Sequence, residues 1–398
     1  PQNVHLSPRL GWIDDLDMLG SALSGQLKAI HSRRPSGGEQ FFVSQTPGVG
    51  NPVFNQEPGY RNQQPPDVGF RILALIRYWN VIEYWFPYRD QIEGDWYKTL
   101  REFIPRLVAA DTWGAYRLEL LALIARIQDS HATLQPVLDV KPPVGDCSWP
   151  IVVRFIEGRP TVTALKVETP EKDFFAIGDI IATVDGEPIR SLIRKWSPYY
   201  SASNETVRLR DIARSLPRGE CGVSMVTVKR LNDEKTLKVA RVANPDPMQF
   251  THDRPGETFQ ILSAGVGYLK LSSIRIQDLD GYFERASDTR GLIIDIRNYP
   301  SEFVVFALGS RLVREPTPFV RFTIGDLGNP GAFSWTQPIA LQPGGSDYKG
   351  VVVILVDEVS ISQAEYTAMA LRAGPRAVVV GSTTAGADGN LSTFALPG

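Results

Sequence analysis

A short apolar run followed by a change in periodicity constrains this chain more than any other feature. The segment Val351–Val356 is wholly apolar and rich in β-branched residues, which is typical of a buried strand in a parallel sheet. From Ser362 onward apolar residues recur at helical spacing, and Gly374 and Pro375 end that pattern. The sequence therefore predicts a strand, a sharp turn and a helix that begins at Ser362.

Two interpretations of Ser362 are open at this point. The run Ser362 to Glu365 (SQAE) fits a capping box, in which the serine and glutamate side chains satisfy backbone donors of the first turn. A serine at the start of a helix can also act as a nucleophile, because the free backbone N–H groups there stabilise an oxyanion. These residues alone do not decide between a cap and a nucleophile.

The segment resembles the nucleophile region of the tail-specific (C-terminal processing) serine proteases, a family that includes the tricorn core. The family pattern is an apolar strand, D-x-x-S-x-S-x-x-E, an Ala-rich helix and then V-V-G-x-x-T-x-G. This chain has Asp357, Ser360, Ser362 and Glu365, followed by VVGSTTAG at 379–386. The resemblance implies a serine-type peptidase, a hydrolase, with Ser362 as its nucleophile.

A candidate base lies at the end of a predicted helix. His131 is one of four histidines and follows the apolar helix expected at 113–127. A histidine in such a place often serves only as a partner of the helix dipole. In tricorn-like members of the family, however, a Ser-His pair supplies the base here, and Ser130–His131 matches that pair. Because neutral imidazole titrates near working pH, the resemblance implies that His131 accepts the Ser362 proton.

The chain departs from the family pattern in the identity of one residue. Bacterial tail-specific proteases use a Ser/Lys dyad, but the expected lysine position holds Ala387. Residue type therefore excludes that dyad and favours His131. Asp129 is a local candidate for orienting His131. In tricorn-like enzymes a downstream carboxylate completes the relay, and we expect this third group beyond Gly398.

A second departure concerns the oxyanion donors. The strand at 291–298 (GLIIDIRN) resembles the family strand that ends in a glycine turn, one of whose N–H groups is an oxyanion donor. Here Pro300 has no N–H to give, so Tyr299 or Ser301 has to serve. The other donor implied by the resemblance is the N–H of Gln363.

The polar residues within that strand end, Asp295 and Arg297, have a simpler explanation. A carboxylate and a guanidinium two residues apart at the end of a buried strand can form a structural ion pair. We favour this structural role over a catalytic one for both charges.

Residues 148–245 predict a small β-rich insert, with strands expected at 151–155, 161–165, 180–184, 223–230 and 237–242. Within it the run at 177–189 (IGDIIATVDGEPI) resembles the central motif of PDZ domains, and Asp185-Gly186 suits a tight turn. PDZ domains bind extended peptides along a sheet edge. No carboxylate-binding loop precedes Ile151, so peptide-tail binding and a structural spacer both stay open.

The predicted fold is multidomain α/β. We expect an N-terminal extension at 1–67 with a helix at 12–30, a helical subdomain at 68–135 with helices at 70–85, 95–108 and 113–127, the PDZ-like insert at 148–245 and a protease core at 256–398. The resemblance implies a ClpP/crotonase-like α/β core with buried strands.

Composition and motifs restrict the partners. A net charge of −2 gives no reason to expect nucleic acid, and no apolar run is long enough to span a membrane. The absence of nucleotide-loop and Cys/His metal motifs predicts no cofactor and no metal. Cys147 and Cys221 could be paired or free, since two cysteines do not decide the compartment. We expect an extracytoplasmic protein, periplasmic or secreted, whose targeting signal is not in this chain.

Three functions are consistent with these features. The first is a serine-type endopeptidase that cleaves peptide or unfolded-protein substrates through an acyl-enzyme. The second is a catalytically inactive family member that binds a peptide or another ligand, which the missing lysine and altered glycine turn favour. The third is an esterase or amidase for small substrates. The sequence gives neither the cleavage preference nor the natural substrate nor the oligomeric state.

Overall fold

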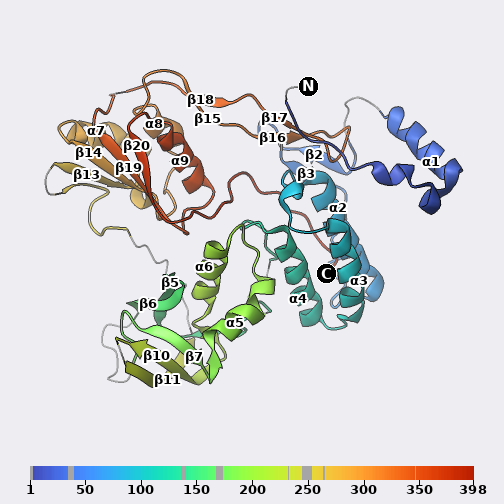
Figure 1. Ribbon diagram of the computed structural model, residues 1–398, viewed down its shortest axis with the longest axis horizontal. Helices are drawn as coiled ribbons and strands as arrows, with labels where there is room; N and C mark the ends of the chain where they lie inside the picture. The colour runs from blue at the N-terminus through green and yellow to red at the C-terminus, as the bar shows by residue number, and fades with distance from the viewer. Residues whose placement is uncertain are drawn as a thin grey trace. The chain divides into compact units, whose positions relative to one another are not determined.

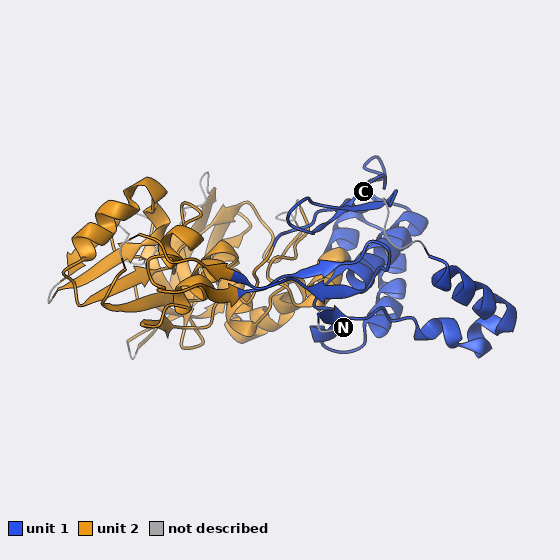
Figure 2. Cartoon of the chain, turned by 90° about the horizontal axis from the view of Figure 1, so that it is seen from above, with its two compact units in different colours: residues 1–119, 320–339, 390–398 blue, residues 120–319, 340–389 orange. Residues whose placement is uncertain are grey.

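The computed structural model describes residues 3–34, 40–135, 140–166, 174–231, 233–243, 253–262, 265–345 and 347–398. The chain forms two compact units, which Figure 2 shows in different colours. Unit 1 consists of residues 1–119, 320–339 and 390–398, and unit 2 consists of residues 120–319 and 340–389. The boundaries of the four segments expected from the sequence stay predictions.

Unit 1 is built mainly from helices where the sequence predicts them. Asp67 and Asp95 start two helices by accepting backbone N–H groups of the first turn. The helices then pack through two buried tryptophans, Trp79 and Trp96, whose indole N–H groups each donate to the other's backbone carbonyl. The helices are η1 (Gly11–Asp14), α1 (Leu16–Ser32), α2 (Val68–Trp85), η2 (Arg89–Gln91), α3 (Trp96–Ala109) and α4 (Trp113–Ile124), the last of which continues into unit 2.

The N-terminal helix α1 buries little of its predicted apolar face. Leu16 and Leu23 recur at helical spacing, yet their side chains are 55% and 45% exposed. Helical spacing of apolar residues therefore does not place these two leucines in a core. Short strands complete unit 1 in two antiparallel sheets, β1-β17-β16 and β2-β3. They are β1 (Val4–Leu6), β2 (Val43–Gln45), β3 (Pro52–Phe54), β16 (Thr323–Gly325) and β17 (Phe333–Trp335).

The first sheet of unit 2 contains the strand from which the sequence analysis started. β19 (Val351–Val356) lies inside the sheet order β12-β13-β14-β19-β20, and the pairs from β13 to β20 are parallel, as predicted. Only β12 runs antiparallel to its neighbour. The other strands are β12 (Phe259–Leu262), β13 (Val266–Lys270), β14 (Gly291–Asp295) and β20 (Ala377–Gly381).

Helices cover this sheet and close its core (Figure 1). Phe283 of α7, Leu308 of α8 and Leu371 of α9 are buried in one cluster with Ile294 and Ile354 of the central strands. The helices are η5 (Leu271–Ser273), η6 (Ile276–Asp278), α7 (Leu279–Ala286), α8 (Val305–Gly309) and α9 (Gln363–Arg372). Helix α9 packs on the sheet through this cluster. It follows β19 in the sequence, as the change of periodicity predicts. β15 (Thr317–Val320) pairs with β18 (Ile339–Leu341).

The second sheet of unit 2 lies in the predicted β-rich region. Its order is β5-β6-β7-β10-β11-β4-β9, with β8 paired to β7. The strands are β4 (Cys147–Ser148), β5 (Ile151–Ile156), β6 (Arg159–Leu165), β7 (Ile180–Val184), β8 (Glu187–Pro188), β9 (Arg218–Gly219), β10 (Gly222–Arg230) and β11 (Asp233–Ala243). The five expected strands are confirmed. The helices η3 (Ala125–Ile127), α5 (Ile189–Trp196), η4 (Ser197–Tyr199) and α6 (Glu205–Ser215) also belong to unit 2.

Two local features of this region answer questions left by the sequence. Asp185 and Gly186 adopt φ values of 49° and 81° between β7 and β8, so the predicted tight turn is confirmed. Cys147 and Cys221 form a disulfide, which settles the choice between paired and free thiols. The PDZ-like character of the region stays a prediction. In the part of the chain that the structure describes, no helix is long and apolar enough to cross a bilayer.

Candidate active site

Ser362 lies in the turn between β19 and α9 with a strained backbone. Its φ of 57° and ψ of −123° fall outside the regions that residues with a Cβ ordinarily occupy. It occupies the N-cap position of α9 but makes no side-chain capping hydrogen bond. The capping-box interpretation is therefore wrong. The described residues provide no hydrogen-bond partner for Ser362 Oγ, and the side chain is only partly buried. Strain of this kind concentrates at functional sites.

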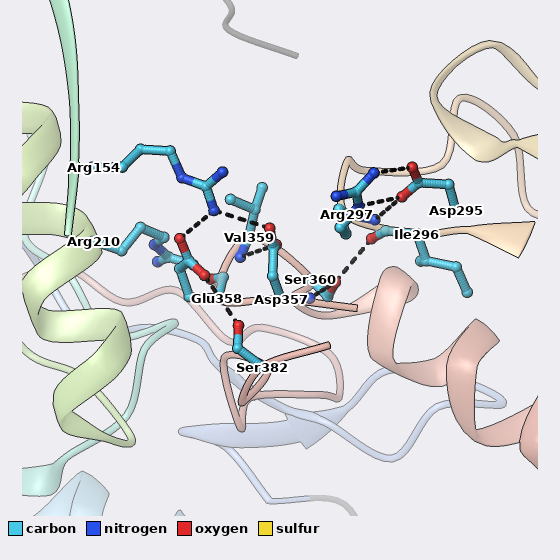
Figure 3. Close-up of polar contacts among 10 residues, drawn as sticks. All are labelled: Arg154, Arg210, Asp295, Ile296, Arg297, Asp357, Glu358, Val359, Ser360 and Ser382. Carbon is cyan, nitrogen blue, oxygen red and sulfur yellow. Dashed lines mark hydrogen bonds and ion pairs between the residues drawn. The ribbon is translucent and has the colours of Figure 1, made fainter. Parts of the chain in front are cut away.

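The first serine of the S-x-S pattern has a structural role. Ser360 is fully buried, and its Oγ donates to the carbonyl of Ile296 at 2.8 Å while accepting the N–H of Asp357 at 3.2 Å (Figure 3). Asp357 in turn accepts the N–H of Val359. These bonds tie the turn that precedes Ser362 to the end of β14.

Two arginines from the β-rich region hold the same turn. Arg154 of β5 pairs with Asp357 at 3.0 Å and with Glu358 at 2.5 Å (Figure 3). Arg210 of α6 donates to the backbone carbonyl of Glu358 at 2.7 Å. Neither arginine is predicted from the sequence. The acidic pair at 357–358 was the available signal, since two adjacent, largely buried carboxylates require a cation.

The segment 384–387, here called the strap, is bound to both ends of the nucleophile turn. The N–H of Ser362 donates to the carbonyl of Ala387, and the N–H of Ala385 donates to the carbonyl of Ser360, both at 2.9 Å. Glu365 accepts from Thr384 Oγ1 at 2.6 Å and from the N–H groups of Gly386 and Ala387 at 2.8 and 2.9 Å. The glutamate that looked like a helix cap therefore holds the strap.

Ser130 is also hydrogen-bonded to the strap. Its Oγ donates to the carbonyl of Ala385 at 3.2 Å and to Ser203 Oγ at 3.1 Å. Ser130 and Ser203 also exchange bonds, each accepting the other's N–H on its hydroxyl. Asn204, which caps α6, donates to the carbonyl of Thr384. The strap therefore connects the surroundings of Ser130 with those of Ser362, although these serines are far apart in sequence.

His131 follows Ser130 and is partly buried. Its backbone N–H donates to Asp129 Oδ1 at 2.8 Å, so this carboxylate holds the main chain of His131. No hydrogen bond joins the His131 ring to Ser362 Oγ within the described ranges. The structure thus brings the segment that carries His131 to the strap, while the Ser362–His131 pair stays a prediction.

The backbone N–H groups of the two predicted oxyanion donors, Gln363 and Tyr299, have no hydrogen-bond acceptor among the described residues. Gln363 occupies the first position of α9, where a backbone N–H has no partner within the helix. Ser301, the alternative to Tyr299, is already engaged because its N–H donates to the carbonyl of Leu271. The side chain of Gln363 donates to the carbonyl of Glu302 at 2.8 Å, which fastens the loop of Tyr299 to the start of α9.

The charged residues at the end of β14 form the predicted structural pair. Asp295 is 1% exposed, receives two hydrogen bonds from the Arg297 guanidinium at 2.6 and 2.9 Å, and accepts one from Tyr268 at 2.8 Å. Burial disfavours its ionised form, yet these hydrogen bonds outweigh burial and hold the pKa of Asp295 below its usual value. The ion-pair interpretation is confirmed.

Asp388, directly after the strap, is an ionisable group that the sequence analysis missed. Burial raises the pKa of Asp388 to about 6, and the nearby Glu365 carboxylate also raises it. A hydrogen bond from the N–H of Gly389 acts in the opposite direction. Among the described residues no group of histidine, cysteine and acidic side chains is arranged to hold a metal.

A strained serine at a helix start, on a largely parallel sheet and beside a strap that follows the next strand, is the arrangement that the resemblance to tail-specific peptidases leads one to expect. Residues 265–398 match the model of peptidase family S41. This match supports a peptidase, which is a hydrolase.

Two solved CPAF structures have a similar fold. Mature CPAF complexed with lactacystin is 14% identical, with a TM-score of 0.59 over 80% of this chain and 85% of that one. A CPAF point mutant is also 14% identical, with a TM-score of 0.61 over 80% and 84%. The photosystem II D1 C-terminal processing protease is 16% identical over 80% and 82%, with a TM-score of 0.42. No curated protein sequence matches the chain.

Proposed function

We propose that the protein is a serine-type endopeptidase that cleaves peptide or unfolded-protein substrates through an acyl-enzyme on Ser362. The observation that carries the proposal is the strained backbone of Ser362 at the start of α9, whose hydroxyl has no hydrogen-bond partner among the described residues. Keeping a non-glycine residue at this φ/ψ costs about 1–3 kcal/mol, so buried contacts have to enforce it. Ser360, Arg154 and the strap supply those contacts.

The proposed reaction begins when Ser362 Oγ attacks the carbonyl carbon of the scissile bond while His131 takes the hydroxyl proton. The N–H groups of Gln363 and Tyr299 stabilise the negative charge on the former carbonyl oxygen. The C–N bond then breaks, His131 returns the proton to the leaving amine, and an ester on Ser362 remains. Water attacks this ester, its proton passes to His131, and the acid product leaves as Ser362 regains the proton.

Ser130 fits the role of a positioning residue in this scheme. Its reciprocal bonds with Ser203 fix the backbone directly before His131. Its hydroxyl also contacts the strap, which in turn binds the backbone of Ser362. A fixed main chain restricts where the imidazole can lie, and catalysis depends on such orientation.

The proposal extends to substrate delivery and location. The β-rich region at 148–245 is proposed to be PDZ-like and to present an extended peptide to the site, as PDZ domains do along a sheet edge. Its link to the nucleophile turn through Arg154 supports a functional connection. The Cys147–Cys221 disulfide supports an oxidising, extracytoplasmic location.

Hydrolysis of a reduced and alkylated protein tests the proposed function. The parent is expected to release fragments, whereas Ser362→Ala and His131→Ala should lose nearly all of this activity. His31→Ala is the matched control, because His31 lies in α1 of unit 1 and its ring is hydrogen-bonded to Arg34 of the same segment. Lactacystin, which is bound in a CPAF structure, is a useful competitor. A folded parent that binds peptides without cleaving them would support the binding-protein alternative.

A further inference from the structure

An aromatic cluster lies beside the first turn of α9. Phe303, Phe306, Phe319 and Tyr366 form it and are here called the aromatic platform. The ring of Tyr366 is central, with centroid distances of 6.1 Å to Phe303, 6.4 Å to Phe306 and 5.3 Å to Phe319. Phe306 also contacts Phe303 and Phe319. Figure 1 shows α8, which carries Phe306, beside α9.

The platform leaves apolar surface in contact with solvent. Phe303 and Phe306 are 50% and 41% exposed, whereas Tyr366 beneath them is 8% exposed. Isolated exposed apolar residues are ordinary, but adjacent aromatic rings exposed together indicate a binding surface. Covering the exposed part of each ring would be favourable, because it removes apolar surface from water. The arrangement therefore suits a ligand that covers the two phenylalanines.

Backbone contacts place the platform next to the proposed reaction centre. The N–H of Tyr366 donates to the carbonyl of Ser362 at 3.0 Å, one helical turn away. Gln363, a proposed oxyanion donor, binds the carbonyl of Glu302, the residue before Phe303. A carbonyl held by the N–H groups of Tyr299 and Gln363 would thus lie at the edge of the platform.

We propose that the aromatic platform is the subsite for an aromatic or large aliphatic substrate side chain on the acyl side of the scissile bond. This inference rests on the proposed function and deepens it. A substrate side chain fits better than a second protein copy, because a stable protein interface needs about 20–30 residues a side. The carboxyl of Asp388 acts on Tyr366 electrostatically, which disfavours an acidic side chain there.

Two phosphonate probes test the subsite directly. In α-aminoalkyl diphenyl phosphonates, Ser362 Oγ attacks phosphorus and one phenoxide leaves with the serine proton, so the labelling rate reports the fit of the adjoining side chain. We expect the benzyl probe to label the parent at least about 10-fold faster than the methyl probe, the discrimination typical of an apolar pocket. Phe303→Ala and Phe306→Ala should each reduce this ratio about 3-fold or more.

A fluorophosphonate without an amino-acid side chain separates the two proposals. It should label the parent, both platform variants and the control Phe41→Ala at similar rates, and the control should keep the parent's benzyl-to-methyl ratio, since Phe41 is an exposed phenylalanine of unit 1. Fluorophosphonate labelling with an unchanged ratio in both platform variants would overturn the subsite alone. Absence of fluorophosphonate labelling in the folded parent would overturn the proposed function and the subsite together.

Discussion

Arg154 donates to Asp357 at 3.0 Å across 203 positions of sequence, so a strand of the β-rich region directly fixes the turn that carries Ser362. Asp357 and Glu358 are largely buried, and Arg154 contacts both carboxylates. Arg154 therefore supplies this turn with a cation from outside the core sheet.

Arg154→Ala should destabilise the fold and slow labelling of Ser362. Removing the guanidinium leaves two carboxylates close together, and a lost hydrogen bond to a charged group costs about 1.5–3 kcal/mol. Urea unfolding and the fluorophosphonate labelling rate measure the two effects. Arg159→Ala is the matched control, because its pair with Glu157 is exposed and is worth about 1 kcal/mol at most. Equal effects of the two substitutions would contradict the proposed role of Arg154.

Glu365→Gln should loosen the strap. The carboxylate accepts three hydrogen bonds, whereas an amide presents N–H groups to at least one of these donors. An unpaired buried donor costs about 1–3 kcal/mol. We expect lower stability in urea and slower labelling of Ser362. Thr384→Val, which removes one of the three donors, should have a smaller effect; an equal or larger one would count against Glu365 as the organiser of the strap.

Asp388→Asn should remove a pH dependence of stability. Because burial raises the pKa of Asp388 to about 6, the folded state binds its proton more tightly than the unfolded chain does. The stabilising contribution of Asp388 is therefore fully present below the pKa of an aspartate in the unfolded chain, about 4. It is lost as the pH rises through the pKa in the folded state, about 6. Relative to the parent, the variant should gain stability between these pH values.

The size of this effect has an upper bound of about 3 kcal/mol, since a pKa difference of one corresponds to about 1.4 kcal/mol, and solvent screening lowers it. Urea unfolding at pH 4 and pH 7 measures it. Parent and variant curves that stay parallel across this range would show that Asp388 ionises as an ordinary exposed carboxyl.

Cys147→Ser with Cys221→Ser should lower the free energy of unfolding by about 4 kcal/mol, from the loop-closure entropy of a disulfide with a sequence separation of 74. Reducing the parent with dithiothreitol should produce the same loss, and the double variant should not respond to the reductant. A double variant as stable as the oxidised parent would contradict this contribution of the disulfide.

Local pattern predicted much of this fold. The apolar run of β19 and the helical spacing after Ser362 depend only on neighbouring residues, and both elements form where expected. Asp185 and Gly186 likewise determine their own turn. Helical spacing was insufficient at α1, because it predicts which residues share a face but not whether another element covers that face.

The site was harder to predict because its contacts join distant segments. Ser-x-x-Glu has the same letters in a capping box and in a nucleophile turn, and the distinction lies in Glu365, whose partners are 19–22 positions away. The resemblance to the family pattern indicated Ser362 as a nucleophile, which capping and helix-propensity rules alone do not predict. Ser203, Arg154 and Arg210 were not predicted, since their contacts with the site are tertiary.

The central claim is that Ser362 is activated by His131. The most direct test is the rate of fluorophosphonate labelling in the parent, Ser362→Ala and His131→Ala, with the labelled peptide identified by mass spectrometry. We predict one adduct on Ser362 in the parent, none in Ser362→Ala, and a rate at least about 100-fold lower in His131→Ala, the loss expected on removing a general base. An adduct on another residue, or an unchanged rate in folded His131→Ala, would contradict the account.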